Sequence, residues 1–187
     1  MSQPLYQGDP RWGQRTVGKG PQTFGLVGCV VTAVAEALRR LGVRAGATPL
    51  DVQAAGLLRP GVWAPGSSGA VVADLCRAQL GVGEVRDVSG AGTVTGIDEL
   101  RTAILDCLAR GGVALAAVDY DRDSPKGDPT AEHWGCIYAV EGDALLMADP
   151  ATAKVERLAV ATLAAKVKWG RVVRPYLVVR TVLVFRE

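Results

Sequence analysis

The hydrophobic period of the chain changes at the glycine pair Gly111-Gly112. Before this pair, apolar residues recur at three- and four-residue steps, a spacing that predicts helices. After it, apolar residues form continuous or alternating runs of strand length, which predict β-strands. Helices first and strands later indicate an α+β domain rather than an alternating βαβ chain. We therefore predict an α+β fold in which N-terminal helices pack on a C-terminal antiparallel sheet.

The length of 187 residues and the apolar content of 49% fit a single domain with a sizeable core. We divide residues 1–187 into an extended N-terminal segment (1–25), a mainly helical half (26–111) and a mainly β half (112–187). Pro175 lacks an N–H group, so it requires an edge position or a break in the last strand. The predicted helices are 29–41, a short one capped by Thr48, one from Ser67 or Ser68 to about residue 80, 97–109 and a short one over 160–168; the predicted strands are 84–88, 113–118, 133–140, 144–148 and 172–185.

The charge and hydropathy pattern argues against several classes of partner. The net charge of +2, from 21 basic and 19 acidic residues, is too small to imply a nucleic-acid or membrane-surface partner. No apolar run approaches the length of a membrane span, so we expect no membrane insertion. Residues 1–6 lack the basic start and apolar centre of a secretory signal peptide. We expect cytoplasmic synthesis, with lysis or incorporation in a particle as the alternative routes out of the cell.

Gly28 and Cys29 stand at the start of the helical pattern over 29–41. A thiol in the first turn of a helix meets unpaired backbone N–H groups and the positive end of the helix dipole. Both favour the thiolate, which is the nucleophilic form of cysteine. The alternative is a small core cysteine beneath a glycine bend, and the helix pattern alone does not decide between the two. Cys76 and Cys107 extend apolar helical stripes, and we predict that both are core thiols.

The single histidine of the chain, His133, is the one possible base for a Cys-His pair. It stands at the start of a predicted strand, where alternation places Cys136 on the opposite face. Asp149 ends the next predicted strand and Pro150 follows it, so adjacent antiparallel strands would bring Asp149 within hydrogen-bond reach of His133. A carboxylate there would orient the imidazole and stabilise it when charged. The alternatives are a structural histidine and a plain Asp-Pro turn.

Two glutamines are candidates to donate a hydrogen bond to an oxyanion beside the backbone N–H of Cys29. They are Gln7 and Gln22, and for each the alternative is an exposed polar residue in a loop. The chain has no Cys-x-x-Cys pair, and its four cysteines do not suggest a disulfide scaffold. With a single histidine present, we expect neither a structural zinc site nor any other cofactor.

Four short motifs occur in one order along the chain: Gln7-Gly8-Asp9-Pro10-Arg11-Trp12, Gly28-Cys29-Val30-Val31-Thr32-Ala33, His133-Trp134-Gly135-Cys136-Ile137-Tyr138 and Met147-Ala148-Asp149-Pro150. Together they resemble the papain-like cysteine peptidases, in the branch related to the bacteriocin-processing (double-glycine leader) peptidases. The resemblance spans residues 7–150 and implies a papain-like fold.

The resemblance also implies a role for each residue of the site. Cys29 would be the nucleophile, His133 the general base, Asp149 the orienting acid and Gln7, rather than Gln22, the oxyanion donor. Three further residues within these motifs are expected to contact substrate: Trp12, Gly28 and Trp134.

The expected activity is hydrolysis of a peptide or amide bond through a thioester on Cys29. Three kinds of substrate fit this activity. They are the peptide cross-links of a bacterial cell wall, which a phage- or bacterium-encoded wall hydrolase would cut, a protein precursor and a short leader peptide. The main alternative is a catalytically silent binding or assembly module, for example a component of a phage particle with a protein partner. An acyl transferase that uses the same three residues is a third option.

Two weaker signals lie in the C-terminal half. The acidic loop over 119–128 begins like a calcium loop, but Ser124 and Thr130 stand where such a loop needs glycine and glutamate, so we favour a solvated loop. The tail from Lys154 onward is rich in lysine and arginine. Because these charges are interleaved with apolar positions, we favour a solvated strand face over a surface for an anionic partner.

Overall fold

The computed structural model describes residues 3–18, 21–55, 69–80, 84–88, 96–119, 133–169 and 171–186. Within them, helices dominate the first half and strands the second. The elements are α1 (Phe24–Val27), α2 (Cys29–Arg40), α3 (Pro49–Ala55), α4 (Gly69–Leu80), β1 (Val85–Asp87), α5 (Ile97–Ala109), β2 (Val113–Asp119), β3 (His133–Glu141), β4 (Ala144–Asp149), β5 (Lys154–Ala159), β6 (Ala164–Trp169) and β7 (Val172–Val184).

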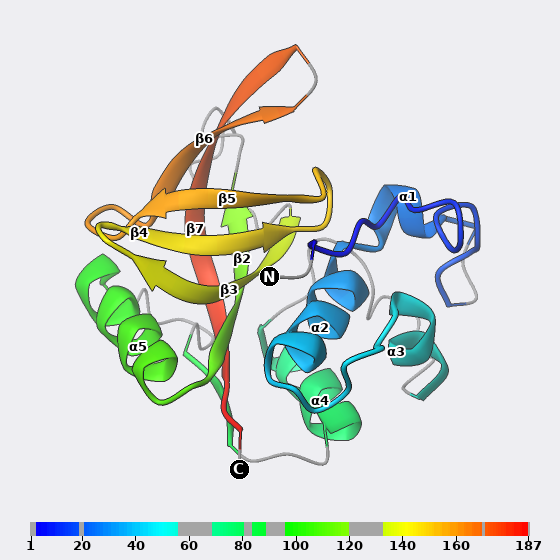
Figure 1. The fold of residues 1–187 in the computed structure, drawn as a ribbon, viewed down its shortest axis with the longest axis horizontal. Coiled ribbons are helices and arrows are strands. Elements are labelled where there is room, and N and C mark those ends of the chain that lie inside the picture. The colour runs from blue at the N-terminus through cyan, green and yellow to red at the C-terminus, as the bar shows by residue number, and fades with distance from the viewer. Residues whose placement is uncertain are drawn as a thin grey trace.

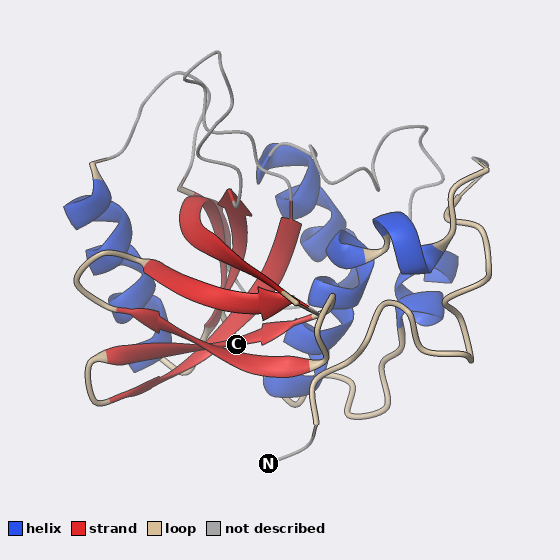
Figure 2. Cartoon of the chain, turned by 90° about the horizontal axis from the view of Figure 1, so that it is seen from above, coloured by secondary structure: helices blue, strands red, loops and turns tan. Residues whose placement is uncertain are grey.

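Six of the strands, β2 to β7, close on themselves as an antiparallel barrel (Figure 1). The strand order is β7-β2-β3-β4-β5-β6, and β6 pairs with β7 again, which completes the ring. The short strand β1 adds to the outside edge of β7, from Val85 opposite Val184 to Asp87 opposite Val182. Helices α2, α3 and α4 lie on one side of the barrel and α5 on the other, as the second view also shows (Figure 2).

The closed barrel corrects the predicted fold class. The sequence indicated a papain-like α+β fold, with helices packed on an antiparallel sheet, and this prediction is wrong: the structure is a mostly β architecture built on a closed barrel, with few helices. The error lies in residues 154–169, where no strand was predicted over 154–159 and a helix was predicted over 160–168. These residues form β5 and β6, the two strands that close the ring.

A physical reason for this error is visible in the composition of the segment. Residues 160–168 contain alanine, leucine and lysine, which favour helices in isolation. In the fold, β6 pairs with β7 from Ala164 opposite Leu177 to Trp169 opposite Val172. Val167 is buried, whereas Lys166 and Lys168 on either side of it are exposed, which is the period of a strand. Tertiary pairing therefore overrides local propensity here.

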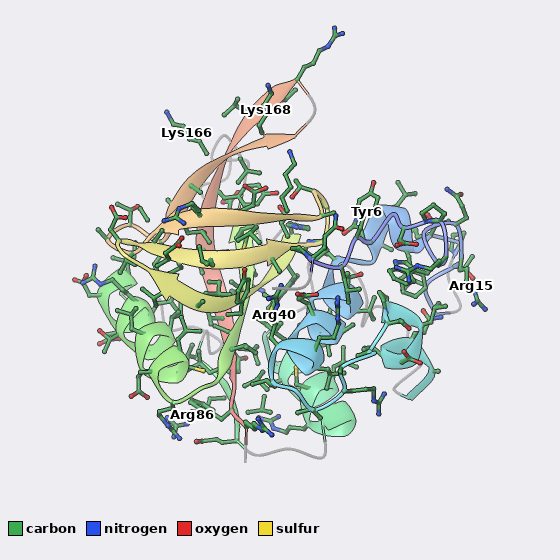
Figure 3. All side chains as sticks on the ribbon, viewed as in Figure 1. Tyr6, Arg15, Arg40, Arg86, Lys166 and Lys168 are labelled. Atoms are coloured by element: carbon green, nitrogen blue, oxygen red, sulfur yellow. The ribbon has the colours of Figure 1, made fainter. Side chains whose placement is uncertain are left out.

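The basic tail follows the same alternation. Lys166 and Lys168 point away from the barrel on the β6 hairpin (Figure 3). Arg157 on β5 forms an ion pair with Glu141 on β3. These cations therefore occupy the solvated face of strands whose other face is core, as predicted.

The strands separate two hydrophobic cores. Alternate residues of β2 enter different cores, with Leu115 in the one under α2 and Ala116 in the one inside the barrel. The first core also contains Cys29 and the second takes in the apolar face of α5 through Ile104. Both faces of β2 are buried, which is why its sequence is continuously apolar.

Several local predictions agree with the structure. Helix α2 begins at Cys29, and α3 begins after Thr48, whose hydroxyl and backbone N–H both hydrogen-bond the Asp51 carboxylate. Pro175 lies in the part of β7 that pairs with β6, before the pairing of β7 with β2 begins at Leu177. Among the described residues, only β6 pairs with β7 at the proline, which fits a residue without an N–H group.

No helix among the described residues is long and apolar enough to cross a membrane.

Candidate functional site

The predicted base and acid are in direct contact. The Nε2 atom of His133 lies 2.7 Å from Oδ1 of Asp149, and both side chains are buried. Because an ionised carboxylate can only accept, Nε2 carries the hydrogen of this bond. The other ring nitrogen, Nδ1, is then the one available to exchange a proton with Cys29.

Two strand ends create this contact. His133 is the first residue of β3, and Asp149 is the last residue of β4. The register pairs Cys136 with Ala148, so Asp149 reaches His133 diagonally beyond the paired part of the hairpin. Trp134 and Cys136 belong to the core under α2, whereas Ile137 belongs to the barrel core, which is the alternation predicted from the sequence.

Cys29 is the third member of the cluster. It is the first residue of α2, with Gly28 as the N-cap. Burial lowers the pKa of His133, but side-chain hydrogen bonds with Asp149 and with Cys29, and the negative charges of both groups, raise it to about 10. The imidazole is therefore held as a cation between a carboxylate and a sulfur, which is the state that stabilises a thiolate.

The carboxylate of Asp149 is held by three donors. Burial raises the pKa of Asp149, but the hydrogen bond and the charge of His133 hold it below 3.8, with help from the backbone N–H of Ala151 and the hydroxyl of Tyr176. Ala151 donates to Oδ1 at 2.7 Å, and Tyr176 donates to Oδ2 at 2.9 Å. Asp149 therefore stays ionised although no part of its surface is exposed.

Gly28 permits the close turn that places Cys29. A Cβ atom on Gly28 would lie 2.5 Å from the backbone oxygen of Phe24, which is closer than real contacts allow. The backbone N–H of Gly28 in turn donates to that oxygen at 2.8 Å. The glycine is thus needed for the approach of α1 to α2, and contact of this glycine with substrate remains a prediction.

Gln7 connects the two sides of the site. Its backbone N–H donates to the oxygen of Pro150 at 2.9 Å, and its side-chain Nε2 donates to the oxygen of Gly25 at 2.9 Å. Because a carbonyl can only accept, the amide orientation is determined, and the second Nε2 hydrogen has no acceptor among the described residues. The side chain is 6% exposed, and its Oε1 atom has no hydrogen-bond partner among the described residues.

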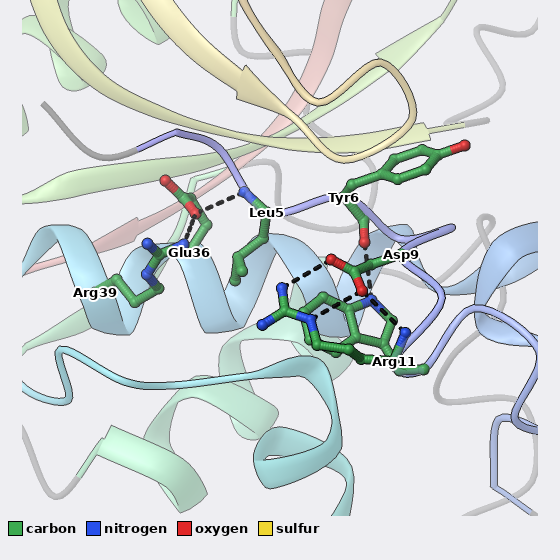
Figure 4. A network of polar contacts seen from close by, with 7 residues as sticks. Leu5, Tyr6, Asp9, Arg11, Glu36 and Arg39 are labelled. Carbon is green, nitrogen blue, oxygen red and sulfur yellow. Dashed lines mark hydrogen bonds and ion pairs between the residues drawn. The ribbon is translucent and has the colours of Figure 1, made fainter.

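The segment that carries Gln7 is attached to α2 by a buried carboxylate (Figure 4). Glu36 is 1% exposed and accepts from the backbone N–H of Leu5 at 3.1 Å. Arg39 and Arg40 pair with the same carboxylate, at 3.2 and 2.7 Å. The charge of Glu36 is thereby neutralised, and the start of the chain is fixed two residues before Gln7.

Gln22 is the rival candidate from the sequence, and the structure places it elsewhere. It is exposed, and its backbone oxygen accepts from the N–H of Val17. Of the two glutamines, only Gln7 is tied to both Gly25 and Pro150.

Trp12 and Trp134 are core residues. They are 2% and 0% exposed and pack in the core under α2, and the indole N–H of Trp12 donates to the backbone oxygen of Tyr6. Both residues therefore pack in the core, and their contact with substrate remains a prediction.

The other cysteines are unsuited to nucleophilic chemistry. Burial raises the pKa of Cys76 to about 12 and that of Cys107 to about 11. Burial also raises the pKa of Cys136 well above 9.0. A thiol that stays protonated is a poor nucleophile, so Cys29 is the cysteine with a chemical environment for reaction.

Two further features bear on ligands. Among the described residues, no group of three or more histidine, cysteine, aspartate and glutamate side chains is placed to hold a metal ion. Residues 120–128 of the acidic loop lie outside the described residues, and so does the comparison of this loop with a calcium loop. A cavity of about 500 Å³ lies between residues 3–12 and the loop at 45–48, and its lining does not include Cys29, His133 or Asp149.

Sequence reasoning proposed Cys29, His133, Asp149 and Gln7 for the site and did not predict the contact of Tyr176 with Asp149. The signal available for Tyr176 was its place in a β-prone run, which does not reveal that this strand passes Asp149. No protein-family model and no curated protein sequence matches the chain.

Proposed function

We propose that the protein is a thiol hydrolase that cleaves a peptide or amide bond with Cys29, His133 and Asp149. The observation that carries the proposal is the buried hydrogen bond between His133 and Asp149, with Cys29 at the other side of the same imidazole. This set is recognised by its geometry and roles, and it occurs on unrelated folds. The proposal therefore does not depend on the fold class that the barrel corrects.

The reaction proceeds by acyl transfer to sulfur. The Cys29 thiolate attacks the carbonyl carbon, the C–N bond breaks, and protonated His133 gives its Nδ1 proton to the leaving amine. Neutral His133 then takes a proton from water, and the resulting hydroxide displaces the acyl group as a carboxylic acid. This second step restores the thiolate and the protonated imidazole, so protons and electrons balance over the cycle.

Gln7 has the place of an oxyanion donor in this scheme. In this proposal the two oxyanion donors are the Nε2 group of Gln7, which bonds the oxygen of Gly25 four residues before Cys29, and the backbone N–H of Cys29. A buried amide with a fixed orientation costs no reorganisation when charge develops on the carbonyl oxygen. Peptides, including those of a bacterial cell wall, carry the carbonyl group that this arrangement would polarise.

The rate of alkylation by iodoacetamide, followed site by site with mass spectrometry, tests the proposal. Cys29 should be labelled rapidly near pH 6, whereas Cys76, Cys107 and Cys136 serve as internal references and should stay unlabelled. His133→Gln should slow Cys29 to the rate of an ordinary thiol. If Cys29 in the wild type reacts no faster than an ordinary thiol, the proposal is wrong.

The substrate is tested separately. The decrease in turbidity of purified cell walls is measured for the wild type and for Cys29→Ala. Clearing by the wild type alone would support a wall peptide as substrate. Equal rates of clearing by the wild type and Cys29→Ala would exclude a wall peptide as the substrate of Cys29.

A further inference from the structure

Tyr176 holds the oxygen of Asp149 that His133 does not use. Its hydroxyl donates to Oδ2 at 2.9 Å, while Oδ1 accepts from His133 and from the backbone N–H of Ala151. Tyr176 and Asp149 are both fully buried. Three donors that converge on two oxygens leave the carboxylate a single orientation.

The barrel fixes the position of this hydroxyl. Tyr176 lies on β7 opposite Ala165 of β6, in the pairing that closes the ring. Its ring packs in the barrel core, and its centroid lies 6.1 Å from that of His133. The hydroxyl therefore reaches Asp149 from the strand pair that closes the barrel, 27 residues along the chain.

We propose that Tyr176 is a positioning residue of the catalytic site, which fixes the orientation of Asp149 toward His133. The inference rests on the proposed hydrolase function and adds a fourth member to its set of side chains. In this role Tyr176 acts through Asp149.

The charge of Asp149 explains why the hydroxyl matters. A hydrogen bond to the ionised form of a buried carboxylate favours that form over the neutral one. Among the described residues, the titratable groups that act on Asp149 or are acted on by it are His133 from β3, Tyr176 from β7 and Glu156 from β5, whose own pKa the charge of Asp149 helps to raise. Without the hydroxyl, Oδ2 loses the donor that the structure gives it and the carboxylate is free to turn.

The first measurement is the titration of the Asp149 side-chain carbon by NMR in Tyr176→Phe, which keeps the ring. Because a hydrogen bond to a charged group shifts a protonation equilibrium by at least about tenfold, the pKa of Asp149 should rise by about one unit. The Cys29 alkylation rate at pH 7 should fall about tenfold, the cost of a mispositioned catalytic group. A role in packing alone would lower the melting temperature and leave the titration of Asp149 unchanged.

Tyr138→Phe is the matched control. Tyr138 lies on β3 but faces Arg40, whose guanidinium carbon is 3.9 Å from the ring centroid. This variant should leave both the Asp149 titration and the alkylation rate at wild-type values.

A second measurement leaves the amino-acid sequence unchanged. Incorporation of 3-fluorotyrosine makes the phenol a stronger donor, so the pKa of Asp149 should fall below its wild-type value. The same labelling in Tyr176→Phe should have no effect on Asp149.

The outcomes separate the two proposals. If the wild-type Cys29 reacts like an ordinary thiol, the hydrolase function fails whatever Tyr176 does. If Cys29 is activated but neither Tyr176→Phe nor fluorotyrosine moves the Asp149 titration, the role of Tyr176 is overturned and the hydrolase function stands.

Discussion

Replacement of Asp149 by asparagine should lower the pKa of His133 by about three units. Asparagine keeps the shape of the side chain, and its Oδ1 can still accept from His133 and from Ala151. Its amide can donate to the oxygen of Tyr176, so the contacts survive with one direction reversed. The change thus removes the charge and preserves the packing.

The size of the effect follows from the geometry. The Nε2 and Oδ1 atoms are 2.7 Å apart, and the charges are spread over both groups. With an effective separation of about 4 Å and an effective dielectric constant of about 20, their attraction is about 4 kcal/mol. One pKa unit corresponds to about 1.4 kcal/mol, so this attraction is about three units. Since Asp149 and Cys29 raise the pKa of His133 to about 10, the variant should titrate near 7.

The assay benefits from the single histidine of the chain. In a protein purified without a histidine tag, the ring proton signals of His133 can be followed by NMR from pH 5 to 11 without assignment. Cys29→Ala is the control for the other neighbour, and it should lower the pKa of His133 while leaving the Asp149 contact in place. A value still near 10 in Asp149→Asn would refute the assignment of the charge pair.

Three further variants, and the acid dependence of stability in Asp149→Asn, test other parts of the structure. Glu36→Gln removes a buried charge from its two arginines and should lower the free energy of unfolding in urea by about 3 kcal/mol. Gly28→Ala forces a Cβ atom against the oxygen of Phe24 and should cost about 1–3 kcal/mol and slow the alkylation of the adjacent thiol. Ala153 has φ of 56°, in the left-handed region that favours glycine. Ala153→Gly should therefore raise the free energy of unfolding by less than about 1 kcal/mol, seen as a slightly higher melting temperature. Because its folded pKa is depressed, Asp149 contributes stability that is present above pH 3.8 and lost as pH falls below it; Asp149→Asn should flatten this acid dependence.

The parts of the site that depend on local structure could be predicted from the sequence. A glycine before an apolar helical run placed Cys29 at a helix start, and the ends of two β-prone runs placed His133 and Asp149 in neighbouring strands. These predictions needed only the hydrophobic periods of helix and strand, and the rule that Gly28 and Pro150 interrupt regular structure. The structure brings the three side chains together as those rules imply.

The parts of the fold and site that depend on closure of the barrel could not be predicted from the sequence. Strand β5 carries charged or polar residues at Lys154, Glu156 and Arg157, and its pattern does not identify a buried face. Its pairing with β6 is a single register pair, Ala159 opposite Ala164. Without these strands the sheet has open edges and resembles the expected α+β arrangement. The contact of Tyr176 with Asp149 was hidden for the same reason.

The correction of the fold and the support for the site are independent of each other. A Cys-His-Asp set needs a thiol at a helix start, an imidazole on a rigid strand and a buried carboxylate behind it. Helix α2 and the β3–β4 hairpin supply these three here, and residues 3–12 join them because Gln7 bonds both Gly25 and Pro150. The barrel contributes the fourth contact, through Tyr176. A variant that opens the barrel between β6 and β7 should therefore impair Asp149 first, although Cys29 lies on a helix outside the ring.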